Sequence, residues 1–201
     1  MRHYSLAEAA LLTGLPLASV RRALEDKVIP SRRVRLRKAV QRLISREGLL
    51  CLKLEQLGVG QLPLAHRRRI YQAVLAHPEA LQVNDSEAVI IDVRKAKREL
   101  RDSLDRYQLA EAMVAEDPEI MAGSPVIQGT RVPVYLIAEM RRQGASISEI
   151  LEGYPSLMQE QIEAAELYAR AHPRRGPKTR TRLPRDTRLV FRKTYPLQRA
   201  S

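Results

Sequence analysis

The segment that most constrains how this chain can fold is residues 129–134, which read Gly-Thr-Arg-Val-Pro-Val. Gly129 permits a turn with positive φ, and Pro133 fixes the backbone just before an amphipathic helix. Pro125 precedes a short extended segment on the other side of the turn. We expect Arg131 to hydrogen-bond carbonyl oxygens around this turn. The pattern therefore predicts a strand, a turn and a helix in close succession.

Three helical patterns follow the turn. The first ends at Gly144, Ser146 or Ser148 caps the second, and Pro155 opens the third. Apolar side chains recur at helical spacing in the first and last of them. These positions are Leu136, Ile137 and Met140, and then Ile162, Ala165 and Tyr168. Residues 114–171 are thus predicted to form a compact helical domain.

Separated motifs of this domain occur in a fixed order. They are Asp-Pro-Glu-Ile at 117–120, Gly-Ser-Pro-Val-Ile at 123–127 before the turn motif, Gly-Ala-Ser-Ile-Ser-Glu-Ile at 144–150, Tyr-Pro-Ser-Leu at 154–157 and Ala-Glu-Leu-Tyr-Ala at 165–169. In this succession they resemble the family known as domain of unknown function 433. The resemblance implies a VapB-like antitoxin of a type II toxin–antitoxin pair.

The positive charge of the chain is concentrated at its two ends. Residues 1–48 carry 11 Lys and Arg against 4 Asp and Glu, and residues 172–201 carry 10 against 1. Residues 114–171 carry only 4 against 9 and are acidic. Basic ends of this kind favour polyanionic or acidic partners.

The N-terminal residues predict two short helices joined by a tight turn. Ser5 and Glu8 form a capping box, which starts the first helix. Gly14 makes the turn, and residues 16–24 form the second helix. Such a pair is typical of a helix-turn-helix whose second helix enters the major groove of DNA.

Basic side chains follow this helix pair immediately. Arg33, Arg35 and Arg37 alternate with apolar residues, which predicts an extended segment with one basic face along a phosphate backbone. Residues 3–46 thereby resemble the MerR-type winged helix-turn-helix. The alternative, a helix pair without a DNA role, is disfavoured by these basic side chains. The expected DNA contacts are Ser19, Arg21 and Arg22 in the groove and Arg32, Arg33 and Arg35 at phosphates.

Residues 49–113 predict an α/β segment and a connecting helix. Residues 49–54 and 88–93 have the pattern of strands, with a helix over 64–77 between them. Residues 94–114 predict a long amphipathic helix that connects the domains or dimerises. Cys51 lies in the first apolar run and is expected to be a core thiol.

Residues 172–201 predict an extended basic tail. Alternating Arg, Thr and Pro cannot bury enough surface to fold alone, so a solvated, disordered end is one interpretation. Its apolar cluster also suits a segment that folds on a partner, with Arg side chains for an acidic rim. The residues expected to bind a toxin are Arg182, Arg185, Arg188, Leu189, Val190, Phe191 and Arg192.

The sequence contains no set of side chains with the spacing of a catalytic centre. The four His residues are scattered, and there is no paired-His motif, phosphate-binding Gly loop or nucleophile elbow. We therefore expect no enzyme activity, no catalytic residue, no metal and no cofactor. No apolar run approaches a membrane span or signal peptide, which predicts a cytoplasmic protein without a membrane partner.

The expected fold is mainly α with minor β, in four parts. These are a winged helix-turn-helix (1–48), an α/β segment with its connecting helix (49–113), a small helix-turn-helix-like domain for dimerisation (114–171) and the basic tail (172–201). A homodimer or a toxin–antitoxin hetero-oligomer is the expected assembly.

The expected function is that of an antitoxin that binds operator DNA and autoregulates its operon. By resemblance, the toxin is a PIN-like ribonuclease, and a tail guanidinium would occupy its cluster of Asp and Glu. The first alternative is a stand-alone transcriptional regulator whose tail is a further DNA arm. An RNA-binding adaptor is disfavoured, because the basic regions contain few aromatic side chains for stacking on bases.

Overall fold

The computed structural model describes residues 2–36, 39–86, 89–119 and 123–174. Over these ranges the chain forms eight α-helices, one 3-10 helix and three two-stranded antiparallel sheets. The prediction of a mainly α fold with minor β is thus confirmed. The predicted toxin-binding residues of the tail lie outside the described residues.

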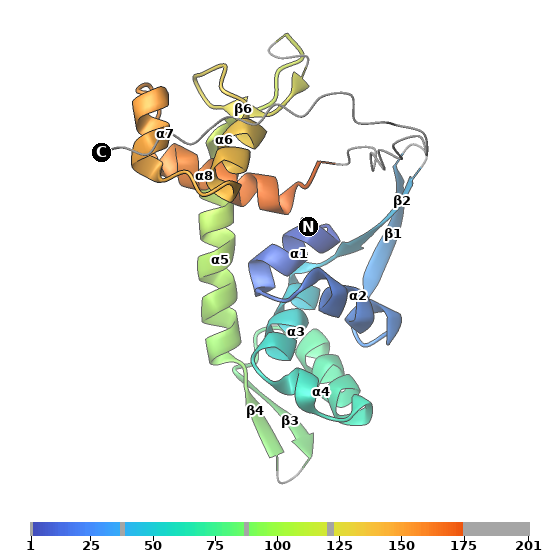
Figure 1. Ribbon diagram of the computed structural model, residues 1–201. Coiled ribbons are helices and arrows are strands. Elements are labelled where there is room, and N and C mark those ends of the chain that lie inside the picture. Colours follow the sequence, from blue (N-terminus) through green and yellow to red (C-terminus); the bar gives the residue numbers. More distant parts are fainter. Residues whose placement is uncertain (1, 37–38, 87–88, 120–122, 175–201) are drawn as a thin grey trace, which may run out of the picture.

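The elements follow one another along the chain as labelled in Figure 1. They are α1 (Leu6–Thr13), α2 (Leu17–Glu25), β1 (Ser31–Leu36), β2 (Ala39–Ile44), α3 (Arg46–Gln56), η1 (Val59–Gln61), α4 (Leu64–Ala76), β3 (Gln82–Ser86), β4 (Val89–Asp92), α5 (Arg94–Ala112), β5 (Val114–Ala115), β6 (Val126–Ile127), α6 (Val134–Arg142), α7 (Ile147–Gly153) and α8 (Gln159–Ala171). The sheets are the hairpins β1–β2 and β3–β4 and the short pair β5–β6.

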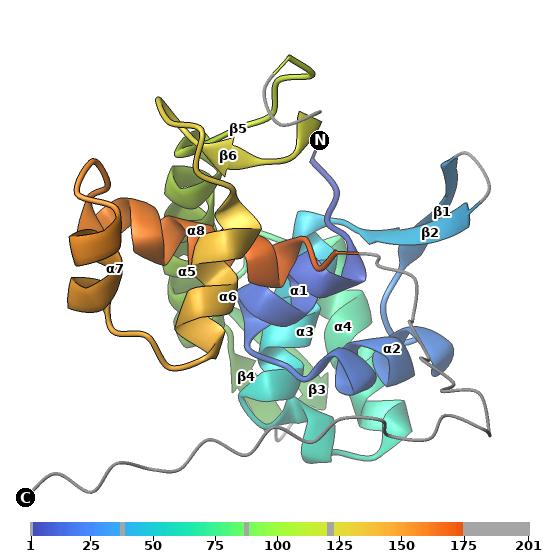
Figure 2. The same cartoon turned by 45° about the horizontal axis from the view of Figure 1, so that its top comes forward.

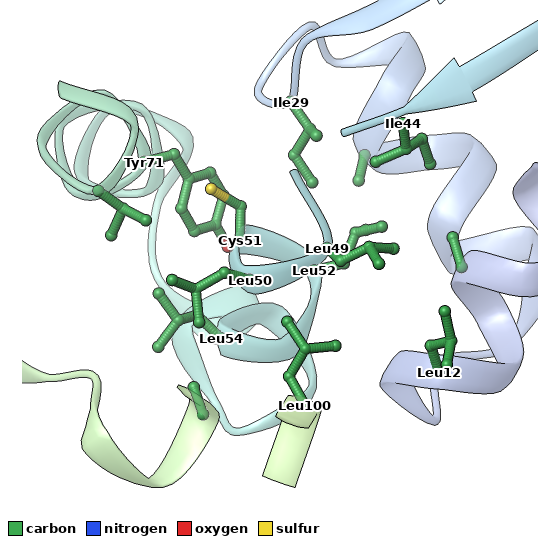
Figure 3. Packing of buried hydrophobic residues seen from close by; sticks show 14 of the residues in the cluster. Leu12, Ile29, Ile44, Leu49, Leu50, Cys51, Leu52, Leu54, Tyr71 and Leu100 are labelled. Carbon is green, nitrogen blue, oxygen red and sulfur yellow. The ribbon is translucent and has the colours of Figure 1, made fainter. Parts of the chain in front are cut away.

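One hydrophobic core joins α1 to α5, and α3 lies at its centre. Residues 48–54 of α3 are all buried. Figure 3 shows the leucines of α3 between Leu12 of α1, Tyr71 of α4 and Leu100 of α5. The described residues from 2 to 112 therefore pack as one body, which we call the N-terminal unit.

The prediction of a strand over residues 49–54 is wrong, because these residues belong to α3. The helix begins after Ser45, whose hydroxyl accepts a hydrogen bond from the Gly48 amide over 3.2 Å. A continuous apolar run fits a buried strand and a buried helix equally well, so periodicity does not separate them. Cys51 is buried in α3 as predicted, and burial raises the pKa of its thiol to about 12.

The other predicted elements of this region are confirmed. The helices expected over residues 64–77 and 94–114 correspond to α4 and α5, and the strand over 88–93 corresponds to β4. The apolar stripe of α5 is at most 4% exposed and contacts α1, α3 and α8. This stripe consists of Ala96, Leu100, Leu104, Tyr107 and Ala110. Since the chain itself covers it, α5 acts as the connecting helix.

A second hydrophobic core lies between α6, α7 and α8, the three helices predicted after the turn. α7 begins at Ser146, whose hydroxyl accepts from the Glu149 amide over 3.2 Å. In Figures 1 and 2, α8 lies across one end of α5, and the two helices are in contact. The buried residues of this core are Ile127, Val134, Ile137, Ile150, Leu157, Ile162, Ala165 and Tyr168.

The turn between β6 and α6 is held by Thr130 rather than by Arg131. Gly129 adopts a φ of 77°. The Thr130 hydroxyl donates to the Ile127 carbonyl over 2.9 Å and accepts from the Val132 amide over 3.1 Å. Arg131 is exposed and forms no side-chain hydrogen bond with the described residues, so its expected role is wrong. The short Thr side chain already satisfies the polar groups of the turn.

Over the described ranges, each helix is too short or too polar to cross a lipid bilayer.

Candidate nucleic-acid interface

α1 and α2 form a helix pair joined by a tight turn. α1 begins at the predicted capping box, in which the Ser5 amide donates to the Glu8 carboxylate over 2.7 Å. The Glu8 amide donates in return to the Ser5 hydroxyl over 3.3 Å. Gly14 ends α1 with a φ of 77°, a conformation that favours glycine. Local sequence signals therefore explain both the start of α1 and the turn that places α2.

α2 buries one face and exposes the other. Val20, Ala23 and Leu24 are at most 5% exposed and belong to the N-terminal core. Because these buried positions repeat at helical spacing, the residues between them lie on the opposite face. The three residues predicted to reach a DNA groove, Ser19, Arg21 and Arg22, are all exposed.

The β1–β2 hairpin extends beside α2 (Figure 2). Arg32, Arg33 and Arg35 of β1 are exposed. The register places Arg33 opposite Arg42. Opposed residues of an antiparallel pair share a face and successive residues alternate, so Arg33, Arg35 and Arg42 lie on one face and Arg32 on the other. The predicted phosphate contacts are thus divided between the two faces of the hairpin.

The arginines of this surface have no acidic partner among the residues that the structure describes. By contrast, Arg67 forms an ion pair with Glu55, and Arg141 forms one with Glu166. Crowded unpaired charges of one sign create a potential that attracts polyanions. Within the described part of the chain, no ion pair or side-chain hydrogen bond is formed by Arg21, Arg22, Arg32, Arg33 or Arg35.

A cleft of about 710 Å³ separates α2 and β2 from the end of α8, and we call it the junction cleft. Arg21, Arg42 and Arg174 line it, and none of the described residues around it is Asp or Glu. The Arg174 guanidinium lies over the Tyr135 ring, 4.4 Å from its centre. Three elements that are far apart in the sequence thus bring positive charge to one cleft.

A second groove, the hairpin groove, lies between the end of α2, the β1–β2 hairpin and α4. It has a volume of about 720 Å³, and Lys27, Arg33, Arg42 and Arg68 line it together with Glu25. Arg42 lines both this groove and the junction cleft. The two therefore adjoin along β2.

A polar cluster around Tyr107 fixes the C-terminal domain to α1. The Tyr107 hydroxyl donates to the Glu8 carboxylate over 2.8 Å and lies 2.9 Å from Nε2 of His172. Arg2 donates to the Glu111 carboxylate over 2.6 Å. Burial and the nearby charge of Glu8 raise the pKa of Tyr107, so its hydroxyl remains a donor. α1, α5 and the end of α8 are joined by this cluster.

Three members of the cluster are also arranged as metal ligands would be. Among the described residues, Glu8, Glu111 and His172 offer ligand atoms that lie within 4.8 Å of one another. The two carboxylates already accept hydrogen bonds from Tyr107 and Arg2. A cation would have to displace the Arg2 guanidinium, so we interpret the cluster as a joint between domains.

The sequence analysis did not identify Arg42, Arg68 or Arg174 as part of this surface. Arg42 belongs to an apolar-rich stretch, residues 39–44, that could have been recognised as the second strand of a hairpin. Arg68 and Arg174 reach the surface through tertiary packing. No local pattern marks either of them.

Residues 114–169 match the family described as protein of unknown function DUF433. The uncharacterized protein y4eO of Sinorhizobium fredii is 30% identical over 187 residues, which cover 85% of this chain and 81% of y4eO. The chain therefore belongs to the same family as y4eO, and its C-terminal helical domain is a DUF433 domain.

Two crystal structures are also similar to parts of the chain. A DUF433 member protein from Anabaena variabilis is 30% identical with a TM-score of 0.30, covering 38% of this chain and 76% of that one. Rv2018 from Mycobacterium tuberculosis is 16% identical with a TM-score of 0.34, covering 81% of this chain and 95% of that one.

Proposed function

We propose that the protein is a VapB-like antitoxin that binds operator DNA through α2 and the β1–β2 hairpin and so autoregulates its operon. One observation carries the DNA-binding part: all six predicted contact residues are exposed, and the arginines among them have no acidic partner within the described residues. Such side chains neutralise phosphates and release counterions, which supplies most non-specific affinity. Ser19, Arg21 and Arg22 on α2 would supply sequence preference.

The resemblance to VapB-like antitoxins supports neutralisation of a toxin. The Arg side chains and apolar cluster of the basic tail support this tail as the toxin-binding segment. The partner is a PIN-like ribonuclease whose metal site is a cluster of Asp and Glu. One of Arg182, Arg185, Arg188 or Arg192 would reach these carboxylates with paired, charge-assisted hydrogen bonds. Leu189, Val190 and Phe191 would fill an apolar groove beside them.

Arg33→Ala and Arg35→Ala test the DNA-binding assignment. Each change removes one phosphate contact, so the slope of log K against log salt concentration flattens by about one unit per lost contact. Arg21→Ala should mainly relax sequence preference. Arg142→Ala is the matched control, because Arg142 already pairs with Glu139. Unchanged operator binding in the Arg33 and Arg35 double variant would reject the assignment.

Point variants are preferable to deletion of residues 1–48, because that deletion opens the shared core around α3. For the tail, truncation after Arg174 retains every described residue. The truncated protein should still bind DNA and should fail to protect cells that express the nuclease encoded beside it. If it protects as well as the full chain, the tail is not the inhibitor.

A homodimer remains part of the proposal, since paired half-sites require a symmetric reader. The apolar stripe of α5 is covered within the chain, so a second copy must bind elsewhere. Sedimentation of the full chain at micromolar concentration should show a dimer. A monomer at all concentrations would leave DNA or the toxin to bring two copies together.

The second candidate is a stand-alone transcriptional regulator whose tail is a further DNA arm. The position of Arg174 in the junction cleft with Arg21 and Arg42 favours it, because the tail then begins beside α2. The deciding observation is whether a nuclease encoded next to this chain co-purifies with it.

A further inference from the structure

We propose that the junction cleft holds one phosphate backbone of the bound duplex, so that Arg174, just after the DUF433 domain, contacts phosphates together with Arg42, while Arg21 at the edge of the cleft reaches the adjoining DNA groove. This inference rests on the proposed DNA binding of α2 and the hairpin. It adds a contact from a residue that directly follows the DUF433 domain, whose net charge is negative.

The charge of the cleft fits a phosphate backbone. Arg21, Arg42 and Arg174 form no ion pair with any described residue, and no carboxylate is among the described residues around the cleft. Three cations that face one cleft repel one another in the free protein. Phosphate oxygens relieve this repulsion and match the planar donor set of guanidinium groups.

Arg174 is held in place before any ligand binds. Its guanidinium lies over the Tyr135 ring, and the Tyr135 hydroxyl donates to the His172 carbonyl over 2.7 Å. His172 in turn contacts the Tyr107 hydroxyl, and its ring packs against Tyr168 at 4.4 Å between centres. A side chain ordered in this way loses less conformational entropy on binding.

The cleft also continues the surface already assigned to DNA. Arg42 lines both the junction cleft and the hairpin groove, where it lies with Arg33. Arg21 extends from α2 into the same cleft. A backbone that passes along the basic face of the hairpin therefore reaches Arg42 first and then Arg174, with Arg21 beside it.

The acidic side chains near α6 do not oppose this placement. Glu139 is bound by Arg142, and Glu166 by Arg141. Both carboxylates line the groove between α6 and α8, which Arg170 and Arg174 line as well, so Arg174 stands between that groove and the junction cleft. Glu139 and Glu166 are thus paired with other arginines, and Arg174 forms no ion pair with any described residue.

The experiment compares Arg174→Ala with Arg170→Ala in the full chain. Both changes remove one exposed Arg near the end of α8, but only Arg174 lines the junction cleft. Binding to a fluorescent mixed-sequence duplex is measured by anisotropy over a range of salt concentrations. Arg174→Ala should weaken binding about five- to tenfold at 0.1 M salt and flatten the salt slope by about one unit. Arg170→Ala should leave both unchanged.

Arg174→Lys keeps the positive charge and therefore tests whether charge alone is needed. Thermal melting shows that a variant is folded, because a folded variant keeps its melting temperature. A photoreactive residue at position 174 should cross-link to the duplex, whereas one at 170 should not. Normal binding by Arg174→Ala alongside weak binding by Arg33→Ala overturns the cleft assignment and leaves the proposed function intact. Normal binding by both overturns the function itself. Equal losses for Arg174 and Arg170, or a preference for RNA over the duplex, also overturn the cleft assignment.

Discussion

The surface of α2 and β1 and the C-terminal end of α6 use their arginines in opposite ways. On α2 and β1, Arg21, Arg33 and Arg35 are exposed and have no partner among the described residues. In the DUF433 domain, Arg141 pairs with Glu166, and Arg142 pairs with Glu139. Surface pairs of this kind contribute little to stability, but they neutralise charge that would otherwise attract anions.

The pairing of arginines is therefore a better guide to a polyanion-binding surface than the net charge of a region. Paired arginines are neutralised by their carboxylate partners and attract phosphates weakly. Arginines without such a partner can bind phosphates directly. Arg174 belongs to the second kind although it follows the acidic domain in the sequence.

The largest expected effect concerns whether the N-terminal unit is one body. Leu49 is fully buried in α3, so Leu49→Ala should lower the free energy of unfolding by roughly 2–5 kcal/mol. Chemical denaturation measures the loss, with Leu109→Ala on the exposed side of α5 as the control. If hydrogen exchange shows that α1 and α2 stay protected while α3 opens, the N-terminal unit is not one cooperative body.

The next effect compares arginines of the α2–β1 surface with exposed arginines of the DUF433 domain. Replacing Arg21, Arg33 and Arg35 together by Ala should lower duplex affinity about 10²- to 10³-fold at 0.1 M salt, from three lost contacts. The matched triple change of Arg131, Arg142 and Arg170 removes the same charge and should leave affinity within about threefold, since screening weakens distant charges. Equal losses in the two triples would mean that net charge alone governs binding.

A smaller effect concerns how the two regions are joined. Tyr107→Phe removes the donor to Glu8 and the contact with His172, which should cost about 1–3 kcal/mol of unfolding free energy. Tyr154→Phe is the control, because that hydroxyl has no hydrogen bond to the described residues. Calorimetry that resolves two transitions in the Tyr107 variant would show that the cluster couples the regions. Identical melting of both variants would contradict that role.

The smallest effect lies at the exposed pair of Arg142 and Glu139. Hydrogen bonds from Arg142, and then from Gln143, lower the pKa of the Glu139 carboxyl to about 2. A depressed carboxyl pKa stabilises the fold above the ordinary carboxyl range, and this contribution is lost as the pH falls toward 2. In Arg142→Ala the pKa should rise toward its usual value in an NMR titration, while the melting temperature at neutral pH falls only slightly, because an exposed ion pair contributes little to stability. A pKa that stays near 2 would assign the depression to Gln143 instead.

Signals that act over a few residues made much of the fold predictable. The Ser5–Glu8 capping box and Gly14 define α1, and the spacing of Val20, Ala23 and Leu24 leaves Arg21 and Arg22 exposed. The six predicted contact residues were identified in this way, and all of them are exposed.

Features that depend on tertiary packing were not predictable in the same way. α3 is buried on every side, so its apolar run lacks the amphipathic period that marks a helix. Arg21 and Arg174 meet across the junction cleft because α8 lies across α5 and ends beside α2. A local sequence pattern contains no information on which distant residues the tertiary structure brings together.

The Tyr107 cluster has a consequence for the order in which this protein is synthesised. Arg2 and Glu8 leave the ribosome first, yet they bind Glu111 and Tyr107, which emerge about a hundred residues later. His172 completes the cluster only after α8 has been made. Domains that fold during translation fold from the N-terminus onward, but here the contacts of α1 with Tyr107 and Glu111 form only after those residues have been made. The nascent chain therefore presents α1, already packed on α3, without the complete Tyr107 cluster until α8 has been made.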